Sequence, residues 1–316
     1  MNGCGGTLPK TDDRLQVVCT IFPEYDWARQ LTQGVDNVDL TLLVKNGTDL
    51  HSYQPSVRDI TMIARADVFC YVGGVSDTWV NDVLDTTENR TAQLVSMAEA
   101  ADADEEVLAE GMQAEHEHEH EHEHDHHDDE SDSHEEPPEL DEHVWLSLRR
   151  AALACTAMKE ALCKADPTHE DIYNQNCTDY LQKLQELDSD FTEMTSQAAR
   201  DTIVVADRFP FRYLAEDYGL TYYAAFPGCS AETEASFETI VFLSEKVESL
   251  HLPCVLVTEG SNSSLAKTIL ENAGSDGKIL TLQSLQAVSQ KEIDTGVTYL
   301  SKMQENYDVL KQALNS

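Results

Sequence analysis

Residues 168–199 read THEDIYNQNCTDYLQKLQELDSDFTEMTSQAA, a long amphipathic stretch that follows the proline at position 167. Proline is favoured at a helix start, so the stretch predicts one helix that begins just after Pro167. At 1.5 Å rise per residue, a helix of this length reaches roughly 45 Å, about the size of a whole lobe. The stretch therefore predicts a rigid strut between two other parts of the chain.

Strands and helices alternate on both sides of this helix. Short apolar runs such as LQVVCTI at 15–21 indicate buried strands, and amphipathic segments such as 56–66 indicate helices. Such alternation is typical of βαβ units and mostly parallel sheets. We therefore predict an α/β fold, with two Rossmann-like lobes whose parallel sheets are joined by the long rigid linking helix. The predicted boundaries are a tether at 1–13, a first lobe at 14–165, the linking helix at 166–199 and a second lobe at 200–316.

Length and charge narrow the possible functions. The 316 residues fit two lobes of ordinary size. The formal net charge of −38 argues against nucleic acid and anionic membrane surfaces as partners, and it favours cations. No run of 18 or more apolar residues occurs, so we expect no membrane span.

The first residues, MNGCGGTLPKTDD, place a cysteine between glycines and then continue as a polar stretch. This arrangement resembles the end of a bacterial lipoprotein signal, with Cys4 as the residue that carries the lipid. The alternative is a disordered terminus with an incidental cysteine. We expect membrane contact only through a lipid anchor on Cys4.

The eight cysteines include no CxxC pair, which argues against a zinc ribbon or a thioredoxin-type site. Seven remain when Cys4 is set aside, so at least one thiol should be free and buried. If a disulfide forms, we favour Cys163 with Cys177, because these two residues flank the turn at Asp166 and Pro167.

Residues 101–142 interrupt the pattern because they contain few apolar side chains, and residues 115–129 read EHEHEHEHEHDHHDD. No packed core can form from such a sequence, so we predict a disordered loop inserted in the first lobe. Neutral imidazoles at this density can share a divalent ion in many geometries, whereas a solvating acidic spacer would not explain the histidines. The predicted auxiliary metal ligands are His116, His118, His120, His122, His124, His126, His127 and His134.

Two histidines outside the repeat stand at element boundaries. His51 lies in NGTDLHSYQPSVRD, residues 46–59, between a predicted strand and a helix. Such loops lie at the carboxyl edge of a parallel sheet, where ligands bind. His143 lies in DEHVWLSL, residues 141–148, where the acidic loop ends. Imidazole nitrogen suits zinc, whereas calcium and magnesium sites are dominated by oxygen, so the pair favours a transition metal.

These segments resemble the zinc and manganese substrate-binding proteins of ABC transporters, the cluster that includes the ZnuA, AdcA, PsaA and TroA types. The segment around His143 is similar to the family's D-P-H-x-W-L element. The resemblance extends to TGVTYLSKMQENYDVLKQAL at 295–314, so it covers essentially the whole chain. The G-x-D-P-H-x-Y-E-P-x-x-x-D element is matched at Gly47, Asp49, His51, Tyr53, Pro55 and Asp59.

The third ligand position departs from this family. Members carry His in zinc types or Glu in manganese types five residues before the tyrosine of an A-F-x-Y-x-A helix, and the matching residue here is Arg208. A guanidinium stays protonated and cannot bind a metal. We therefore predict that Asp207 or Glu259 supplies the missing ligand, with water or a loop histidine as the alternatives. Arg208 would then position that carboxylate.

The resemblance implies an extracytoplasmic protein that captures Zn²⁺ with high affinity and delivers it to the permease of an ABC importer. It implies a monomer, held at the outer face of the cell membrane by the lipid anchor or present in the periplasm. The alternatives are a manganese-type protein that takes Mn²⁺, or a metal-buffering surface adhesin of the same fold. A zinc hydrolase is less favoured, since no predicted helix carries H-E-x-x-H and no G-x-S-x-G occurs, so we expect no enzyme.

Overall fold

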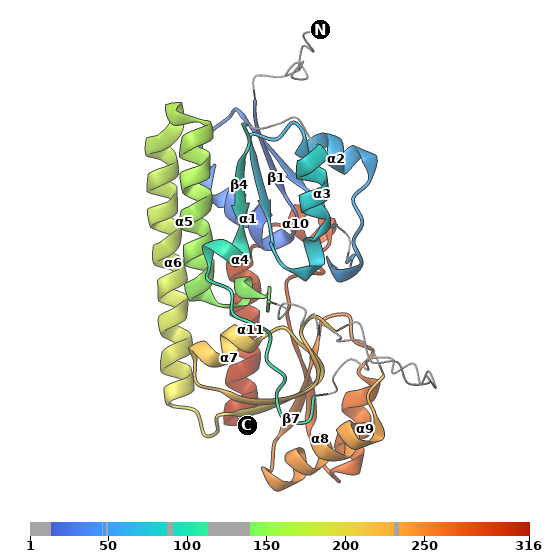
Figure 1. Cartoon of the computed structure of the whole chain (residues 1–316). Coiled ribbons are helices and arrows are strands. Elements are labelled where there is room, and N and C mark those ends of the chain that lie inside the picture. Colours follow the sequence, from blue (N-terminus) through green and yellow to red (C-terminus); the bar gives the residue numbers. More distant parts are fainter. Residues whose placement is uncertain (1–13, 46, 49, 87–90, 113–139, 231–233) are drawn as a thin grey trace, which may run out of the picture.

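Two parallel four-stranded sheets form the frame of the molecule in the computed structural model, which describes residues 14–45, 47–48, 50–86, 91–112, 140–230 and 234–316. The strand order is β2-β1-β3-β4 in the first sheet and β6-β5-β7-β8 in the second. The strand pairs within each sheet are parallel. Figure 1 shows the sheets in separate halves of the molecule. The predicted α/β fold with two lobes is thus confirmed.

The first lobe follows the predicted alternation of strands and helices. Its two central strands, Leu15–Cys19 and Val68–Tyr71, are largely apolar and buried, as expected in a parallel sheet that helices cover on both faces. The elements are β1 (Leu15–Cys19), α1 (Phe22–Leu31), β2 (Val38–Leu42), α2 (Val57–Ile63), β3 (Val68–Tyr71), α3 (Trp79–Thr86), β4 (Gln93–Ser96) and α4 (Met97–Ala100).

The second lobe repeats this plan after the long helix. Its central strands, β5 and β7, are again apolar along most of their length. The elements are β5 (Thr202–Phe209), α7 (Arg212–Asp217), β6 (Thr221–Pro227), α8 (Phe237–Ser249), β7 (Cys254–Thr258), α9 (Ser264–Asn272), β8 (Lys278–Leu282), α10 (Gln290–Asp294) and α11 (Tyr299–Asn315).

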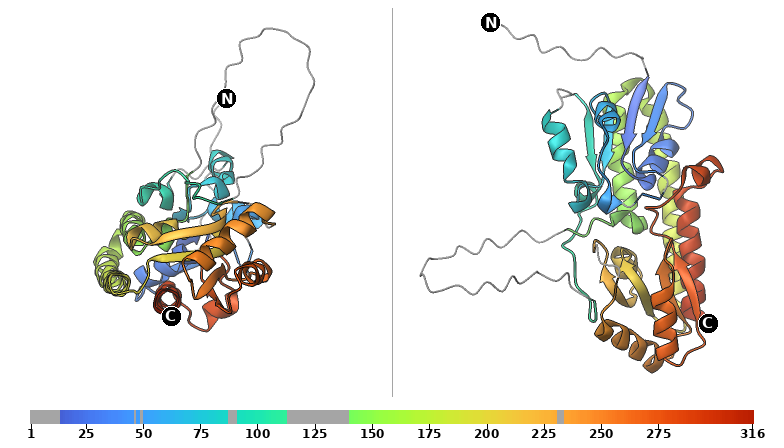
Figure 2. Two further views of the ribbon diagram at one scale, coloured as in Figure 1. Left: turned by 90° about the horizontal axis from the view of Figure 1, so that it is seen from below. Right: turned by 90° about the vertical axis from the view of Figure 1, so that its right-hand side faces the viewer.

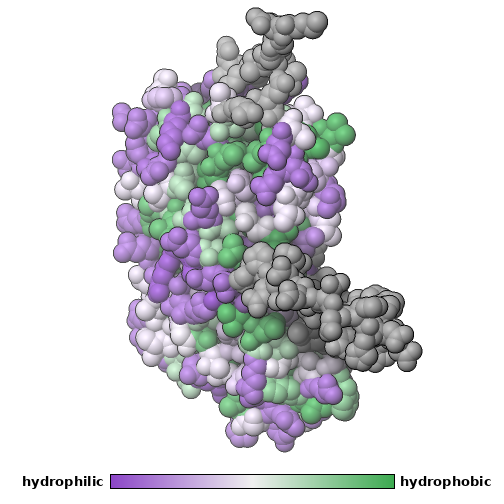
Figure 3. All heavy atoms as spheres, in the orientation of Figure 1, coloured by the Kyte–Doolittle hydropathy of each residue, from purple (hydrophilic) through white to green (hydrophobic). Residues whose placement is uncertain are grey.

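The helices α5 (Leu148–Ala165) and α6 (Glu170–Ser196) lie side by side, α5 along the first lobe and α6 along both lobes (Figure 1). The buried side chains of α6 recur every three or four residues, from Tyr173 to Met194, so one stripe faces the core. Toward the first lobe, Asn176 donates hydrogen bonds to the carbonyl of Leu31. Toward the second lobe, the ring of Phe191 stacks on Tyr218 with centroids 4.8 Å apart. Hydrophilic side chains cover much of the outer surface in this region (Figure 3).

The C-terminal segment makes a second connection between the lobes. The backbone N–H of Tyr299 donates to Asp26 Oδ2 at 2.7 Å, and the Tyr299 ring packs edge-on against Trp27 of α1. Ile293 joins Phe22 in a small apolar cluster of the first lobe. From there α11 continues to the second lobe, as both views of Figure 2 allow the reader to follow. The segment predicted as second lobe, 200–316, therefore packs partly against the first.

Part of the segment predicted as a disordered loop, 101–142, has a defined structure, so the predicted loop was too long. Residues 101–112 and 140–142 hold defined places, because groups distant in sequence bind them. Arg150 donates to the carbonyl of Ala101 at 2.6 Å, and the Tyr213 hydroxyl accepts from Asp104 N at 2.9 Å and donates to Asp141 O at 2.7 Å. The eight predicted loop histidines and Cys4 lie outside the described residues.

The favoured disulfide between Cys163 and Cys177 is not formed. All seven cysteines of the described part are free thiols, and Cys177 Sγ instead lies 3.9 Å from the carbonyl oxygen of Cys155. None of the helices in that part combines the length and the apolar character needed to cross a bilayer.

Candidate metal centre

His51 is held at the carboxyl end of β2 by a short 3₁₀ helix, Leu50–Ser52. Leu50 is fully buried and anchors this turn, while the imidazole of His51 is 14% exposed. His51 Nδ1 lies 2.6 Å from Ser76 Oγ, in the loop after β3. Ser76 donates its only hydroxyl proton to Glu142 Oε1, so it accepts the proton on His51 Nδ1. This relay places the lone pair of His51 on Nε2.

His143 is fully buried at the start of the 3₁₀ helix Val144–Leu146. Asp141 Oδ1 accepts from His143 Nδ1 at 2.9 Å and from its backbone N–H at 3.1 Å. The lone pair therefore lies on Nε2, which is buried and has no hydrogen-bond partner in the described part of the chain. Burial lowers the pKa of His143, but the hydrogen bond and charge of Asp141 outweigh it and raise the pKa above its ordinary value.

Trp145 fixes this turn against the second lobe. Its indole N–H donates to Ser284 O at 2.8 Å, and its own carbonyl accepts from the Tyr299 hydroxyl at 2.6 Å. The ring centroids of His51 and His143 are consequently only 5.7 Å apart. The structure thus brings together the two histidines that the sequence singled out, although they come from segments far apart in the chain.

Glu142 is the third member of the cluster, and sequence reasoning missed it. One ligand atom each from His51, Glu142 and His143 lies within 4.8 Å of the others. Glu142 is fully buried, its Oε2 accepts from Ser76 N at 3.0 Å, and its Oε1 lies 3.5 Å from His51 Nδ1. Burial raises its pKa. The available signal was a departure from D-P-H-x-W-L, because Glu142 stands where that element has proline.

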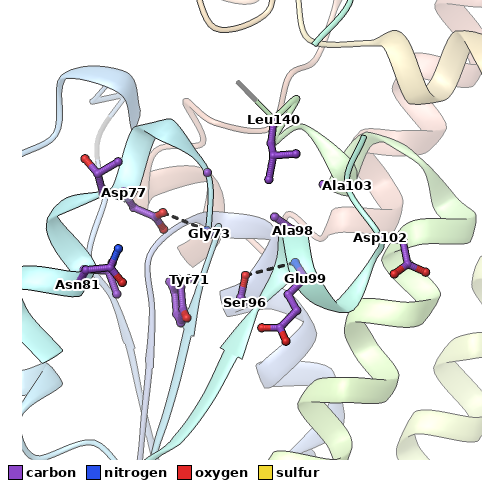
Figure 4. A pocket seen from close by; sticks show the side chains of 13 residues that line it. Tyr71, Gly73, Asp77, Asn81, Ser96, Ala98, Glu99, Asp102, Ala103 and Leu140 are labelled. Carbon is purple, nitrogen blue, oxygen red and sulfur yellow. Dashed lines mark hydrogen bonds between the residues drawn. The ribbon is translucent and has the colours of Figure 1, made fainter. Parts of the chain in front are cut away.

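Asp77 lies just behind this cluster. It accepts backbone hydrogen bonds from Val72 at 2.8 Å and Gly73 at 2.9 Å, the second of which Figure 4 shows. Burial raises the pKa of Asp77 to about 7, and the charge of Glu142 adds to the rise. Asp77 also lines an open pocket of about 490 Å³, with Gly74 between that pocket and Glu142. The pocket therefore adjoins the histidines without containing them.

Asp207 does not join the histidine cluster. It sits near the end of β5, beside an irregularity in the pairing with β6. Its Oδ2 accepts from the Thr258 hydroxyl at 2.7 Å and from Thr258 N at 3.3 Å. Its other oxygen accepts from the backbone of Arg208 at 2.9 Å, and Arg208 Nη1 lies 3.5 Å from the carbonyl of Ser230. Asp207 thus links β5 to β7, and its role as a ligand stays a prediction that this geometry does not support.

Glu259 is likewise engaged inside the second lobe. Its two oxygens accept from the Ser284 backbone N–H and hydroxyl, each at 2.6 Å. Ser284 is the residue whose carbonyl holds Trp145. Glu259 therefore supports the turn that carries His143 indirectly, through Ser284, and it is not part of the histidine cluster.

The second lobe meets His143 with backbone, at the loop after β6. A Cβ added to Gly228 would lie 2.9 Å from Cε1 of His143, so only glycine allows this approach. The next residue, Cys229, donates its backbone N–H to Glu106 Oε1 at 3.3 Å. Sequence reasoning missed Gly228 and Glu106, since neither carries a local signal of its role.

Comparison with known proteins places these features in context. A family model described as zinc-uptake complex component A, periplasmic (ZnuA), matches residues 17–313. The zinc-binding lipoprotein AdcA of Streptococcus pneumoniae is 31% identical over 303 residues, which is 96% of this chain and 56% of the relative. The high-affinity zinc uptake system protein ZnuA of Bacillus subtilis is 30% identical over 309 residues, 98% of this chain and 90% of the relative.

Solved structures agree with these matches. The Zn(II)-bound ZnuA-like domain of AdcA from Streptococcus pneumoniae superimposes with a TM-score of 0.72 at 28% identity, covering 96% of this chain and all of that one. The metal-dependent lipoprotein YcdH of Bacillus subtilis gives a TM-score of 0.75 at 25% identity, covering 95% and 100%. The chain spans about half the length of the full AdcA relatives that it matches.

Proposed function

We propose, from the premise that the chain belongs to the ZnuA family of periplasmic zinc-uptake components, that it captures Zn²⁺ outside the cytoplasm and delivers it to an ABC-transporter permease. One observation carries the proposal. His51 and His143 converge with centroids 5.7 Å apart, and a hydrogen-bond partner on Nδ1 of each ring directs a lone pair to Nε2. Such partners on the far ring nitrogen are a regular feature of histidines that bind metals.

The donor set favours zinc over manganese. Two imidazole nitrogens suit a borderline-soft ion, whereas manganese prefers oxygen-rich sites. The names of AdcA and ZnuA, which state zinc binding for the first protein and zinc uptake for the second, support the same choice. A manganese-type protein of this fold is the second candidate, and metal competition separates it from a zinc protein. A metal-buffering adhesin of the same fold is separated by the uptake measurement, because an adhesin needs no permease.

The lobes are suited to local rearrangement more than to wide opening. The helix α6 runs along both lobes, and the Asp26–Tyr299 hydrogen bond adds a second connection. Such ties restrict hinge motion, so release of the ion involves the loops around Gly228 and Trp145. On this proposal the His-rich loop gathers ions, a lipid on Cys4 tethers the protein, and no reaction is catalysed.

The test is zinc binding by the metal-free protein, measured by competition with a chelating indicator and by calorimetry. One tight site should appear, Mn²⁺ should compete poorly, and ⁶⁵Zn uptake should fall in cells that lack the protein and return when it is restored. Absence of a tight site, or tighter binding of Mn²⁺ than of Zn²⁺, would contradict the proposal.

A further inference from the structure

We infer that Glu142 is the third protein ligand of the ion, so that His51, Glu142 and His143, all from the first lobe, hold the ion without a side chain of the second. The inference rests on the proposed function. The family's third ligand position corresponds to Arg208, in the second lobe, which cannot bind a metal. The inference assigns the third ligand to Glu142, in the first lobe.

Buried charge is the first argument. Asp77, Asp141 and Glu142 are each at most 2% exposed and gather at one edge of the first sheet. Within the described residues, the ion pairs of Asp141 and Glu142 are with histidines, and none is with Lys or Arg. Buried carboxylates without a fixed cation are costly, and a protein normally pairs them or uses them for a metal. A divalent ion among the two rings and Glu142 supplies the missing charge.

The orientation of the carboxylate is the second argument. Ser76 donates its backbone N–H to Oε2 and its hydroxyl to Oε1, so one donor residue holds both oxygens. Each carboxylate oxygen has two acceptor positions, and each keeps one for a metal. A Cβ on Gly74 would lie 2.2 Å from Oε2, so the backbone here closes tightly over the Glu142 side chain. Glu142 is therefore preorganised beside His51.

The state of the second lobe is the third argument. Among the described residues, neither Asp207 nor Glu259 belongs to the histidine cluster. Asp207 instead binds Thr258, and Glu259 binds Ser284. What reaches the His143 ring from this lobe is the backbone at Gly228. Within the described residues, the second lobe therefore approaches His143 with backbone and adds no carboxylate to the cluster.

Two histidines and one glutamate form a known zinc ligand set that leaves a fourth position for water. A site built on one lobe has a consequence for delivery. Movement of the second lobe would uncover the ion without breaking a bond between the metal and the protein. Release would then depend on an incoming ligand at the open fourth position.

The deciding experiment compares Glu142→Gln with Ser76→Ala in the whole protein. Gln keeps an acceptor for Ser76 but loses the charge and the carboxylate. Loss of a residue that only supports a metal ligand lowers metal affinity by about 10- to 100-fold. If Glu142 is a ligand, E142Q should therefore lower zinc affinity by more than about 100-fold, whereas S76A should lower it by only about 10-fold. Asp207→Asn and Glu259→Gln should each stay within about threefold of wild type, since neither side chain joins the cluster.

Zinc-edge X-ray absorption supplies a direct readout. Wild-type protein should show two imidazoles with oxygen donors, and E142Q should keep both imidazoles while its oxygen shell changes. Equal losses in E142Q and S76A, or a loss in D207N or E259Q as large as in E142Q, would overturn the inference and leave zinc capture intact. If wild-type protein shows no tight site, the proposed function itself fails.

Discussion

The carboxyl edges of the two sheets offer a direct comparison. Both edges carry acidic side chains close to His143 or to the turn that holds it. At the first edge, Glu142 accepts from Ser76 and lies 3.5 Å from His51 Nδ1, and within the described residues it forms no ion pair with Lys or Arg. At the second edge, Asp207 and Glu259 receive donors from Thr258 and Ser284 at 2.6–2.7 Å. Glu142 and Glu259 each accept two hydrogen bonds from one serine, so hydrogen bonding does not distinguish them. The difference is position, because only Glu142 lies in the cluster with the two histidines among the described residues.

The largest effect is expected at the first edge. His143→Ala should lower zinc affinity by more than about 100-fold, which is the most that loss of a group supporting a ligand costs. The reason is that it removes a buried nitrogen that Asp141 directs at the ion. His51→Ala should behave alike. The double variant should add little further loss, since the residues act as one unit. Calorimetry of the three variants measures these affinities. A tight site that persists in H143A would contradict the assignment of the ion to the first edge.

Glu259→Ala should act on stability instead of affinity. The change leaves the Ser284 N–H and hydroxyl without their carboxylate, at a cost of about 1–2 kcal/mol in the free energy of unfolding for a partly exposed hydrogen-bonded group. Urea denaturation of the metal-free protein measures this value. Zinc affinity should change little, and a large loss of affinity with unchanged stability would show that Glu259 touches the ion.

Deleting residues 115–134 should remove weak binding of several ions and leave the single tight site unchanged. The reason is that His51, Glu142 and His143, which form the cluster in the described part of the chain, all lie outside the deleted segment. Zinc titration with equilibrium dialysis resolves both classes of site. Disappearance of the tight site would make a loop histidine a ligand, and it would reduce the contrast between the two edges.

The smallest effect is expected for Arg208→His. The guanidinium lies near the carbonyl of Ser230 in the second lobe, so a histidine there should change zinc affinity by less than about threefold. Competition titration, with circular dichroism as the control for folding, is sufficient. A pronounced gain would show that the second lobe can still present a ligand from this position, whereas a pronounced loss would show that Arg208 supports the site.

Local pattern was enough to predict the frame of the molecule. The apolar runs that became β1 and β7 and the amphipathic stripe that became α6 are short-range signals, because each records which face of one element is buried. The sequence also singled out His51 and His143 as candidate ligands, since both stand at junctions between predicted elements. Their roles as ligands remain predictions.

The arrangement of the site was decided by hydrogen-bond partners that are distant in sequence. Only the folded chain sets Ser76 between His51 and Glu142, satisfies Asp207 with Thr258, and turns the segment before α11 back onto Asp26. Such pairings produce no periodic pattern in the sequence, because each depends on one donor meeting one acceptor across the fold. The sequence by itself therefore determined two α/β lobes, a long helix and two candidate histidines. The tertiary structure determined which carboxylate lies beside them, because residues far apart in sequence meet in one cluster only when the chain folds.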